Sequence, residues 1–202
     1  MDDSNRKTLE SYDVSIQAYI DGTSQVVSGA SKDWIDAALA DLPEAPKVLE
    51  LGSAFGRDAA YMAALGIEPE CTDAVPGFVE HLQAKGFDAR LFNLLTDGLT
   101  QQYDLIIANA VLLHFTREQF RMILRKLRPA LCPEGRLAFS LKAGEGEEWS
   151  DAKIGAPRFF CYWQVQQVKE ELRQAGYHAP SLELAHTDRK HGDWLFVIAS
   201  PL

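Results

Sequence analysis

The sequence has few cysteines, and their small number excludes two classes of protein. Its 202 residues include three, Cys71, Cys132 and Cys161. The count is odd and no pair has the spacing of metal ligands, which argues against a disulfide framework or a zinc site. We therefore expect reduced thiols and a cytoplasmic protein.

A secretory signal and a membrane anchor are missing as well. Residues 1–7 are polar and contain no apolar segment of the kind that signal peptides need. The longest apolar run extends from Leu105 to Leu113, is interrupted by Asn109, and is too short to span a bilayer. We expect no membrane partner.

Basic residues are in the minority. The 20 Lys and Arg side chains are outnumbered by 29 Asp and Glu side chains, and the formal net charge is −9. A phosphate backbone would be repelled on average, so we expect no nucleic-acid partner. The sequence also lacks a nucleophile elbow, a phosphate-binding loop, an HExxH motif and a carboxylate cluster that would hold magnesium, so we expect no metal.

The chain does contain a regular alternation of apolar strands and amphipathic helices. This alternation predicts a mostly parallel sheet with helices on its faces. Strands are expected at residues 47–51, 68–72, 89–93, 103–108, 136–141, 181–186 and 194–200, and helices at residues 5–20, 31–42, 57–65, 77–85, from Thr116 onward, and 164–175.

Local signals define several boundaries. Ser31 is a good N-cap for the second helix, and Thr116 with Gln119 resembles a capping box. Residues 133–135 are expected to form a turn, and a loop rich in Gly and Glu should precede the helix at 164–175. A polar turn at residues 189–193 joins the last two strands, which predicts an antiparallel hairpin.

The most informative segment is the turn Gly52–Gly56, which lies between a strand and a helix. Such a turn brings backbone N–H groups close to a ligand. A dinucleotide-binding turn needs glycines at relative positions 1, 3 and 6, which here hold Gly52, Ala54 and Arg57. An arginine at the third position argues against that cofactor. The alternative pattern is an acid, Glu50, followed by glycines at alternate positions, with only the middle one replaced by Ala54.

This second pattern resembles the class I S-adenosylmethionine-dependent methyltransferases of the small bacterial type, over roughly residues 45–200. Asp73-Ala74, residues 103–114 and residues 127–137 occur in the order and spacing of that family, and the terminal hairpin is similar to its reversed seventh strand. The resemblance implies a Rossmann-like, doubly wound, mostly parallel seven-stranded sheet with an antiparallel terminal hairpin. We expect one domain, residues 1–202, with an N-terminal helix that serves as a lid (1–30) and a core (31–202).

The resemblance also implies a cofactor site for S-adenosylmethionine, with S-adenosylhomocysteine as product. Gly52, Ser53, Ala54 and Gly56 would line its methionine and ribose side. The remaining cofactor contacts would be Glu50, Arg57, Asp58, Ala108 and Asn109 toward the methionine, Asp73 at the ribose hydroxyls, and Ala74, Val75, Asn93 and Leu94 beside the adenine.

Several of these residues have structural alternatives. Asp73 could cap the helix that starts near Pro76, and Glu50 could be an ordinary acid at a strand end. Asn93 is equally compatible with a turn, and Arg57 with a surface salt bridge. If position 54 requires a positive φ, alanine there costs free energy.

Methyl transfer needs positioning and exclusion of water more than it needs a strong base. His114 follows the fourth strand and is either a structural histidine or a general base. Tyr12 and Tyr19 share a helix face and are either core aromatics or part of a lid. His114, Tyr12 and Tyr19 are therefore the candidate catalytic residues. Arg158, Phe159 and Tyr162 would border the acceptor pocket, with a hydrophobic wall as the alternative.

These observations predict an enzyme, a monomer or homodimer, that transfers a methyl group to N, O or S of a small-molecule acceptor. Two alternatives remain. A non-catalytic module could bind S-adenosylmethionine or S-adenosylhomocysteine and retain the fold, an idea that Ala54 supports. An NAD(P)-dependent reductase is the other alternative, which Arg57 and the terminal hairpin oppose.

Overall fold

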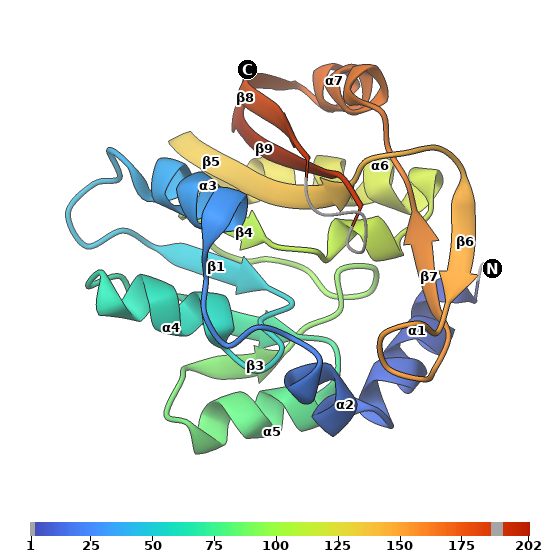
Figure 1. The fold of residues 1–202 in the computed structure, drawn as a ribbon. Helices are drawn as coiled ribbons and strands as arrows, with labels where there is room; N and C mark the ends of the chain where they lie inside the picture. Colours follow the sequence, from blue (N-terminus) through green and yellow to red (C-terminus); the bar gives the residue numbers. More distant parts are fainter. Residues whose placement is uncertain (1–2, 187–191) are drawn as a thin grey trace.

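The computed structural model describes residues 3–186 and 192–202, and a seven-stranded sheet crosses the middle of the molecule (Figure 1). Its strand order is β3-β2-β1-β4-β5-β9-β8, and β6 and β7 form a separate two-stranded sheet. The strands are β1 (Val48–Leu51), β2 (Glu70–Asp73), β3 (Ala89–Leu91), β4 (Tyr103–Ala108), β5 (Leu131–Lys142), β6 (Glu147–Ser150), β7 (Arg158–Cys161), β8 (Tyr177–Ala185) and β9 (Trp194–Pro201).

The pairing of these strands confirms the predicted fold class. Strands β3, β2, β1, β4 and β5 pair in parallel, β9 pairs antiparallel with β5, and β8 pairs antiparallel with β9. The sheet is therefore mostly parallel and ends in an antiparallel hairpin. Residues 189–191 of the predicted hairpin turn lie outside the described residues.

The central strands are buried because successive side chains enter two different cores. In β4, Ile106 and Ala108 pack with the helices of one face, while Leu105 and Ile107 pack with those of the other. This alternation is the ordinary geometry of a strand, and two apolar cores explain why β4 is apolar at nearly every position.

Helices cover both faces of the sheet. They are α1 (Ser4–Asp13), α2 (Ile16–Asp21), α3 (Gly29–Leu39), α4 (Arg57–Ala64), α5 (Pro76–Ala84), α6 (Arg117–Leu127) and α7 (Val165–Gln174), with short 3-10 helices η1 (Leu112–His114) and η2 (Arg128–Ala130). The capping box of Thr116 and Gln119 is present as predicted. The expected start at Ser31 is wrong, because α3 begins at Gly29 and its N-cap position is Ser28.

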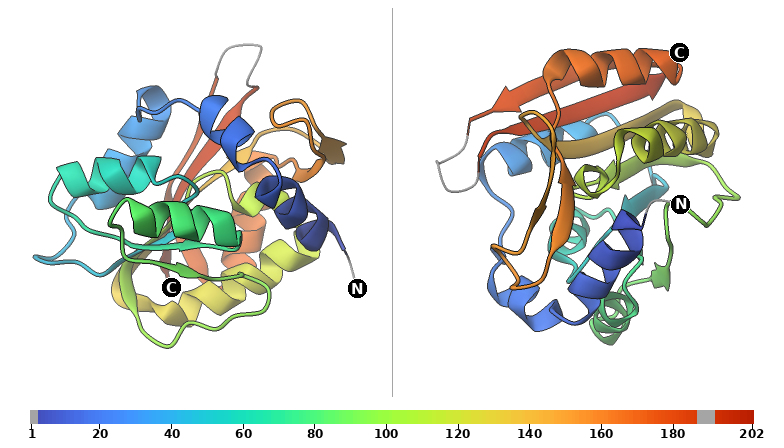
Figure 2. Two further views of the ribbon diagram at one scale, coloured as in Figure 1. Left: turned by 90° about the horizontal axis from the view of Figure 1, so that it is seen from below. Right: turned by 90° about the vertical axis from the view of Figure 1, so that its right-hand side faces the viewer.

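The N-terminal region differs from its prediction. The expected continuous helix at residues 5–20 is interrupted between Asp13 and Ile16. Moreover, the buried residues of α1 are the polar ones, Ser4, Asn5, Thr8 and Ser11. Two of them contact β7 and the residue before it: Thr8 Oγ1 accepts a hydrogen bond from Phe159 N, and Ser11 Oγ donates one to Pro157 O. Figures 1 and 2 show α1 lying alongside β7.

Two further predictions are corrected by the strands. The expected turn at residues 133–135 lies within β5, at an irregularity in its pairing with β4. Gly135 is suited to this place because a Cβ would lie 2.8 Å from Tyr103 O. The Gly- and Glu-rich segment, expected to be a loop, instead contributes β6 and leads to β7, which pair with each other.

Candidate active site

The turn after β1 has the backbone conformation of a close-approach loop. Gly52, Ala54 and Gly56 all have positive φ, at 68°, 48° and 85°. A Cβ on Gly52 would lie 2.5 Å from Val111 Cγ2, so only glycine fits there. Position 54 thus requires a positive φ, and alanine there carries a backbone strain that glycine would avoid.

Asp73 ends β2 and holds this turn in place. Its Oδ2 accepts a hydrogen bond from Ala54 N and its Oδ1 accepts one from Val75 N, each at 2.9 Å. Burial raises the pKa of the carboxyl to about 6, although the backbone donors oppose that shift. Asp73 therefore orders the segment before α5 and also links it to the turn after β1.

A polar network connects the start of α4 to the end of β4. The Asp58 carboxylate accepts hydrogen bonds from Arg57 Nε at 2.7 Å and from Asn109 Nδ2 at 2.8 Å. Asn109 Oδ1 in turn accepts from Ser140 Oγ at 2.6 Å. Arg57 is thus engaged in an ion pair, the structural alternative considered for it, and Ala110 follows with a positive φ of 58°.

Glu50 lies beneath this network in the middle of the sheet. Its side chain is 3% exposed. Burial, reinforced by the nearby acid Asp58, raises the pKa of the carboxyl to about 8. The residue is therefore neutral over much of the physiological range, unlike an ordinary acid at a strand end.

A cavity opens above the turn and between the strand ends. Eleven of the predicted site residues line it: Tyr12, Tyr19, Gly52, Ala54, Asp73, Ala74, Val75, Asn93, Leu94, Asn109 and His114. The other predicted residues do not contribute to its wall: Glu50, Ser53, Gly56, Arg57, Asp58, Ala108, Arg158, Phe159 and Tyr162.

Asn93 is at once a turn residue and part of the cavity wall. Its Oδ1 accepts a hydrogen bond from Leu95 N, and its Nδ2 donates one to Asn5 on α1. Sequence reasoning missed the wall residues Asn5, Thr8, Leu9, Phe78 and Ala110. The polar Asn5 and Thr8 gave no amphipathic signal, because they are buried on the face of α1 that periodicity marks as solvent-exposed.

Tyr12 and His114 meet at the boundary of the cavity. His114 Nδ1 is 2.6 Å from Phe159 O, and since a carbonyl only accepts, this nitrogen carries the proton. Nε2 therefore accepts the hydrogen bond of Tyr12 OH, at 2.9 Å. Burial lowers the pKa of His114 to about 3 and raises that of Tyr12, so both are neutral near pH 7.

The three predicted acceptor-side residues occupy the β6–β7 sheet and its continuation. Arg158 is 5% exposed and donates a hydrogen bond to Tyr12 OH at 3.2 Å. Phe159 is buried and uses its backbone, through N to Thr8 and through O to His114. Tyr162 follows β7 and donates a hydrogen bond to Glu148.

The site has the architecture of a known family. A family model described as a methyltransferase domain matches residues 26–181. The chain belongs to this family. The predicted class I family is confirmed, and with it the assignment of the chain as an enzyme. No curated protein matches the methyltransferase.

Solved structures share the fold of this methyltransferase at low sequence identity. The 1,6-didemethyltoxoflavin N1-methyltransferase of Burkholderia thailandensis, solved with 1,6-didemethyltoxoflavin and S-adenosylhomocysteine, has a TM-score of 0.75 and 20% identity over 100% of this chain and 91% of its own. DhpI, in a complex named DhpI-SAM-HEP, has a TM-score of 0.74 and 17% identity, covering 100% and 99%. The CcbJ methyltransferase of Streptomyces caelestis has a TM-score of 0.72 and 18% identity over 96% of this chain and 98% of its own.

The described part of this methyltransferase contains neither a helix suited to cross a membrane nor a group of side chains suited to hold a metal ion. None of its helices there combines the length and the apolar character that a membrane crossing requires. Within residues 3–186 and 192–202, no three His, Cys, Asp or Glu side chains gather in a way that could hold a metal ion.

Proposed function

We propose that this methyltransferase transfers a methyl group from S-adenosylmethionine to N, O or S of a small-molecule acceptor. The observation that carries the proposal is the cavity above the strained turn Gly52–Gly56, with the Asp73 carboxylate in its wall. Two of the neighbours named above are solved with S-adenosylhomocysteine or as a complex with SAM in its name, which supports the same cofactor here.

The residues present fit that cofactor. Its ribose offers hydroxyl donors, and the buried carboxylate of Asp73 is the matching acceptor at the end of β2. Its adenine has flat ring faces that pack against apolar side chains, and Val75, Phe92 and Leu94 supply apolar wall to the cavity. The bound cofactor supplies a methyl group already activated on a sulfonium, so the protein needs chiefly to position the acceptor.

Helices α1 and α2 support the proposed lid, residues 1–30. Asn5, Thr8, Leu9 and Tyr12 of α1 and Tyr19 of α2 contribute wall to the cavity. The Tyr12 ring also packs edge-on against the Tyr19 ring, with centroids 5.4 Å apart. These helices separate the reacting groups from water, and exclusion of water favours the transfer.

Tyr12 is the proposed catalytic group, and His114 is proposed to position it. The hydroxyl of Tyr12 donates to His114 Nε2 and accepts from Arg158. Both nitrogens of His114 are engaged and its pKa is about 3, which makes a free general base at this residue unfavourable. Tyr12 therefore acts by orienting the acceptor through its hydroxyl oxygen, and a proton that the acceptor loses passes to solvent rather than to His114.

The alternative function is a non-catalytic module that binds S-adenosylmethionine or S-adenosylhomocysteine. Ala54 favours it, because its φ of 48° places a methyl group in a conformation that glycine adopts without cost. This alternative predicts binding of the cofactor without turnover.

Two measurements test these proposals. Titration calorimetry with S-adenosylhomocysteine should show saturable binding, whereas NADH should not bind. A screen of small metabolites for formation of S-adenosylhomocysteine should then find an acceptor. Absence of S-adenosylhomocysteine binding contradicts both functions, and binding without any turnover favours the non-catalytic module.

A further inference from the structure

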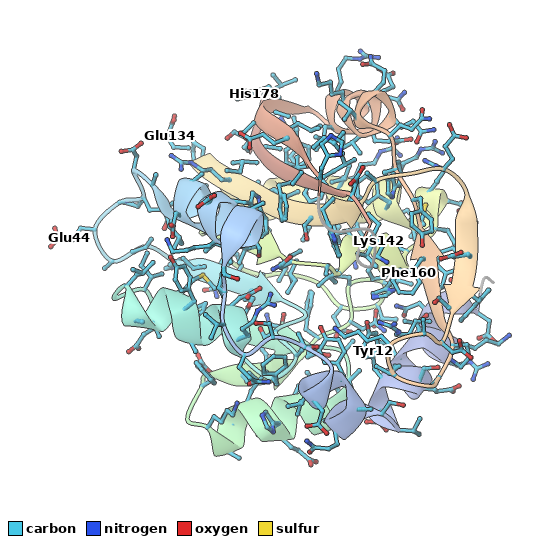
Figure 3. The ribbon with its side chains drawn as sticks, in the orientation of Figure 1. Tyr12, Glu44, Glu134, Lys142, Phe160 and His178 are labelled. Atoms are coloured by element: carbon cyan, nitrogen blue, oxygen red, sulfur yellow. The ribbon has the colours of Figure 1, made fainter. Side chains whose placement is uncertain are left out.

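Three cationic side chains gather beyond Tyr12, on the side of the β6–β7 sheet. The guanidinium carbon of Arg158 and Nζ of Lys142 each lie 5.0 Å from the centroid of the Phe160 ring. Nζ of Lys153 lies 4.3 Å from the centroid of the Tyr19 ring. Figure 3 shows Lys142 and Phe160 next to each other above Tyr12. Lys142 is the last residue of β5, so it stands at the edge of the sheet where the cofactor turn lies.

These cations are not neutralised by the protein. Among the described residues, none of the three forms an ion pair, and Arg158 has a single hydrogen bond, to Tyr12 OH. Its buried Nε has no partner. Glu148 is the acid whose charge attracts Lys142, and its carboxylate already accepts a hydrogen bond from the Tyr162 hydroxyl.

The cluster is unexpected in a chain with a formal net charge of −9. Partial burial and repulsion from Arg158, Arg57 and Lys142 lower the pKa of Lys153 to about 8. Burial and repulsion from Arg158 also lower the pKa of Lys142. Of the three, Arg158 is buried, Lys142 is half-buried and Lys153 is exposed. A buried charge without a counter-charge is unfavourable, so an anion that enters the cluster removes a cost that falls mainly on Arg158.

We propose that the methyl acceptor carries an oxyanion, a carboxylate or a phosphate, which Arg158, Lys142 and Lys153 bind as a handle beyond Tyr12. The inference rests on the proposed function, since it names the acceptor class of the same site. A planar guanidinium with free N–H groups and two ammonium groups are the donors that bind such oxyanions in proteins. The aromatic rings of Phe160 and Tyr19 hold the cations by cation–π contact and leave their outer N–H groups for the anion.

The experiment measures anion binding directly and does not require turnover. The full chain, saturated with S-adenosylhomocysteine, is treated with a lysine-acylating reagent in the presence of increasing inorganic phosphate or acetate. Mass spectrometry then follows the acylation rate of each lysine. Lys47, which is exposed before β1, and Lys169, which is exposed on α7, serve as internal controls.

Both anions should slow acylation of Lys142 and Lys153 in a saturable manner and leave Lys47 and Lys169 unchanged. Stronger protection by phosphate identifies a phosphate site, and stronger protection by acetate a carboxylate site. Lys142→Gln should weaken the protection of Lys153 about tenfold in apparent affinity, as should Arg158→Gln if that variant folds. Lys47→Gln should have no effect.

Failure of this inference differs from failure of the proposed function. Equal protection of all four lysines, or none at any anion concentration, overturns the oxyanion handle while binding of S-adenosylhomocysteine persists. If S-adenosylhomocysteine does not bind in calorimetry, the proposed function fails whatever the lysines show. Protection that survives unchanged in Lys142→Gln also overturns the handle.

Discussion

The proposed cofactor side and the proposed acceptor side of the site differ in how their charges are paired. On the cofactor side, Asp73 accepts two backbone N–H groups, and Asp58 is bonded to Arg57 and Asn109. On the acceptor side, the described residues provide no counter-charge within ion-pair distance of Arg158 or Lys142. The charged side chains of the first region are paired with groups of the same chain, and those of the second region are not.

This difference follows the elements that build each half of the site. The proposed cofactor side is built by the turn after β1 and by the ends of β2 and β4. The proposed acceptor side is built by α1, β6 and β7, and α1 contacts β7 through Thr8 and Phe159. Tyr12 contributes to both, because it lines the cavity and its hydroxyl binds Arg158.

The largest effect is expected from Tyr12→Phe, which removes the hydroxyl that links the two regions. With an acceptor in hand, we expect turnover to fall by about 100-fold, because His114 Nε2 and Arg158 lose their partner and the acceptor loses the hydroxyl that orients it. The affinity for S-adenosylhomocysteine should change little. Steady-state kinetics and calorimetry measure the two quantities.

Tyr61→Phe is the matched control, since its hydroxyl donates to Asp36 on α3, away from the cavity. Unchanged turnover in Tyr12→Phe would make this tyrosine a core aromatic. The pH–rate profile adds a check on His114. A pKa near 6.5 that disappears from the profile in His114→Ala would contradict the buried, neutral imidazole and assign His114 as the base, whereas one that remains belongs to Asp73, whose pKa is about 6.

The next largest effect is expected from Asp73→Ala, on the cofactor side. Hydrogen bonds to a charged group contribute about 1.5–3 kcal/mol each, so calorimetry should show at least about tenfold weaker binding of S-adenosylhomocysteine. Asp104→Ala is the control, because that carboxylate accepts Lys47 N at the opposite edge of the sheet. Equal affinity of Asp73→Ala and wild type would leave Asp73 with only its role in the turn.

A smaller effect is expected from Glu50→Gln, and it depends on pH. The folded protein keeps a proton on Glu50 up to about pH 8, whereas a free carboxyl releases it at 4.5, so folding stability falls as the pH rises through this window. Asp73 adds a decline in stability that ends at about pH 6, His114 acts in the opposite direction below 6.5, and Lys153 acts in the opposite direction above about 8. Between pH 6.5 and 8, Glu50 therefore makes the largest contribution.

Thermal unfolding across that interval should show a melting temperature that declines by a few degrees in wild type and is flatter in Glu50→Gln. The variant should be the more stable protein at the upper end. Parallel curves for the two proteins would mean that Glu50 is ionised in the folded state and that a neighbouring cation compensates its burial.

The smallest effect is expected from Ala54→Gly. Glycine relieves the positive φ but adds freedom to the unfolded chain, so we expect a stability change of about 1 kcal/mol or less. S-adenosylhomocysteine should bind as well as in wild type or more tightly. Ala60→Gly, at an exposed position inside α4, is the control and should lose about 0.5–1 kcal/mol. A folded Ala54→Gly protein that binds many-fold more weakly would show that the turn uses the methyl group.

The sequence by itself determined the parts of this protein whose signals are local. Strand β4 coincides with the predicted residues 103–108, because two apolar cores require an unbroken apolar strand. The capping box of Thr116 and Gln119 and the terminal hairpin follow from side chains a few residues apart. The alternation of these elements was sufficient for the sheet. The family followed from the turn with Glu50, Gly52 and Gly56 together with Asp73-Ala74, residues 103–114, residues 127–137 and the terminal hairpin, in that order and spacing.

Only the tertiary structure decided what is buried on α1 and what stands beside His114. Amphipathic periodicity assumes that apolar side chains are buried, yet Thr8 and Ser11 are buried because they satisfy the backbone of the β7 segment, almost 150 residues away in sequence. Tyr12 and Arg158, which share a hydrogen bond, are likewise separated by 146 residues in the sequence. No local pattern encodes such a contact, because its free energy arises only when the folded sheet brings the two segments together.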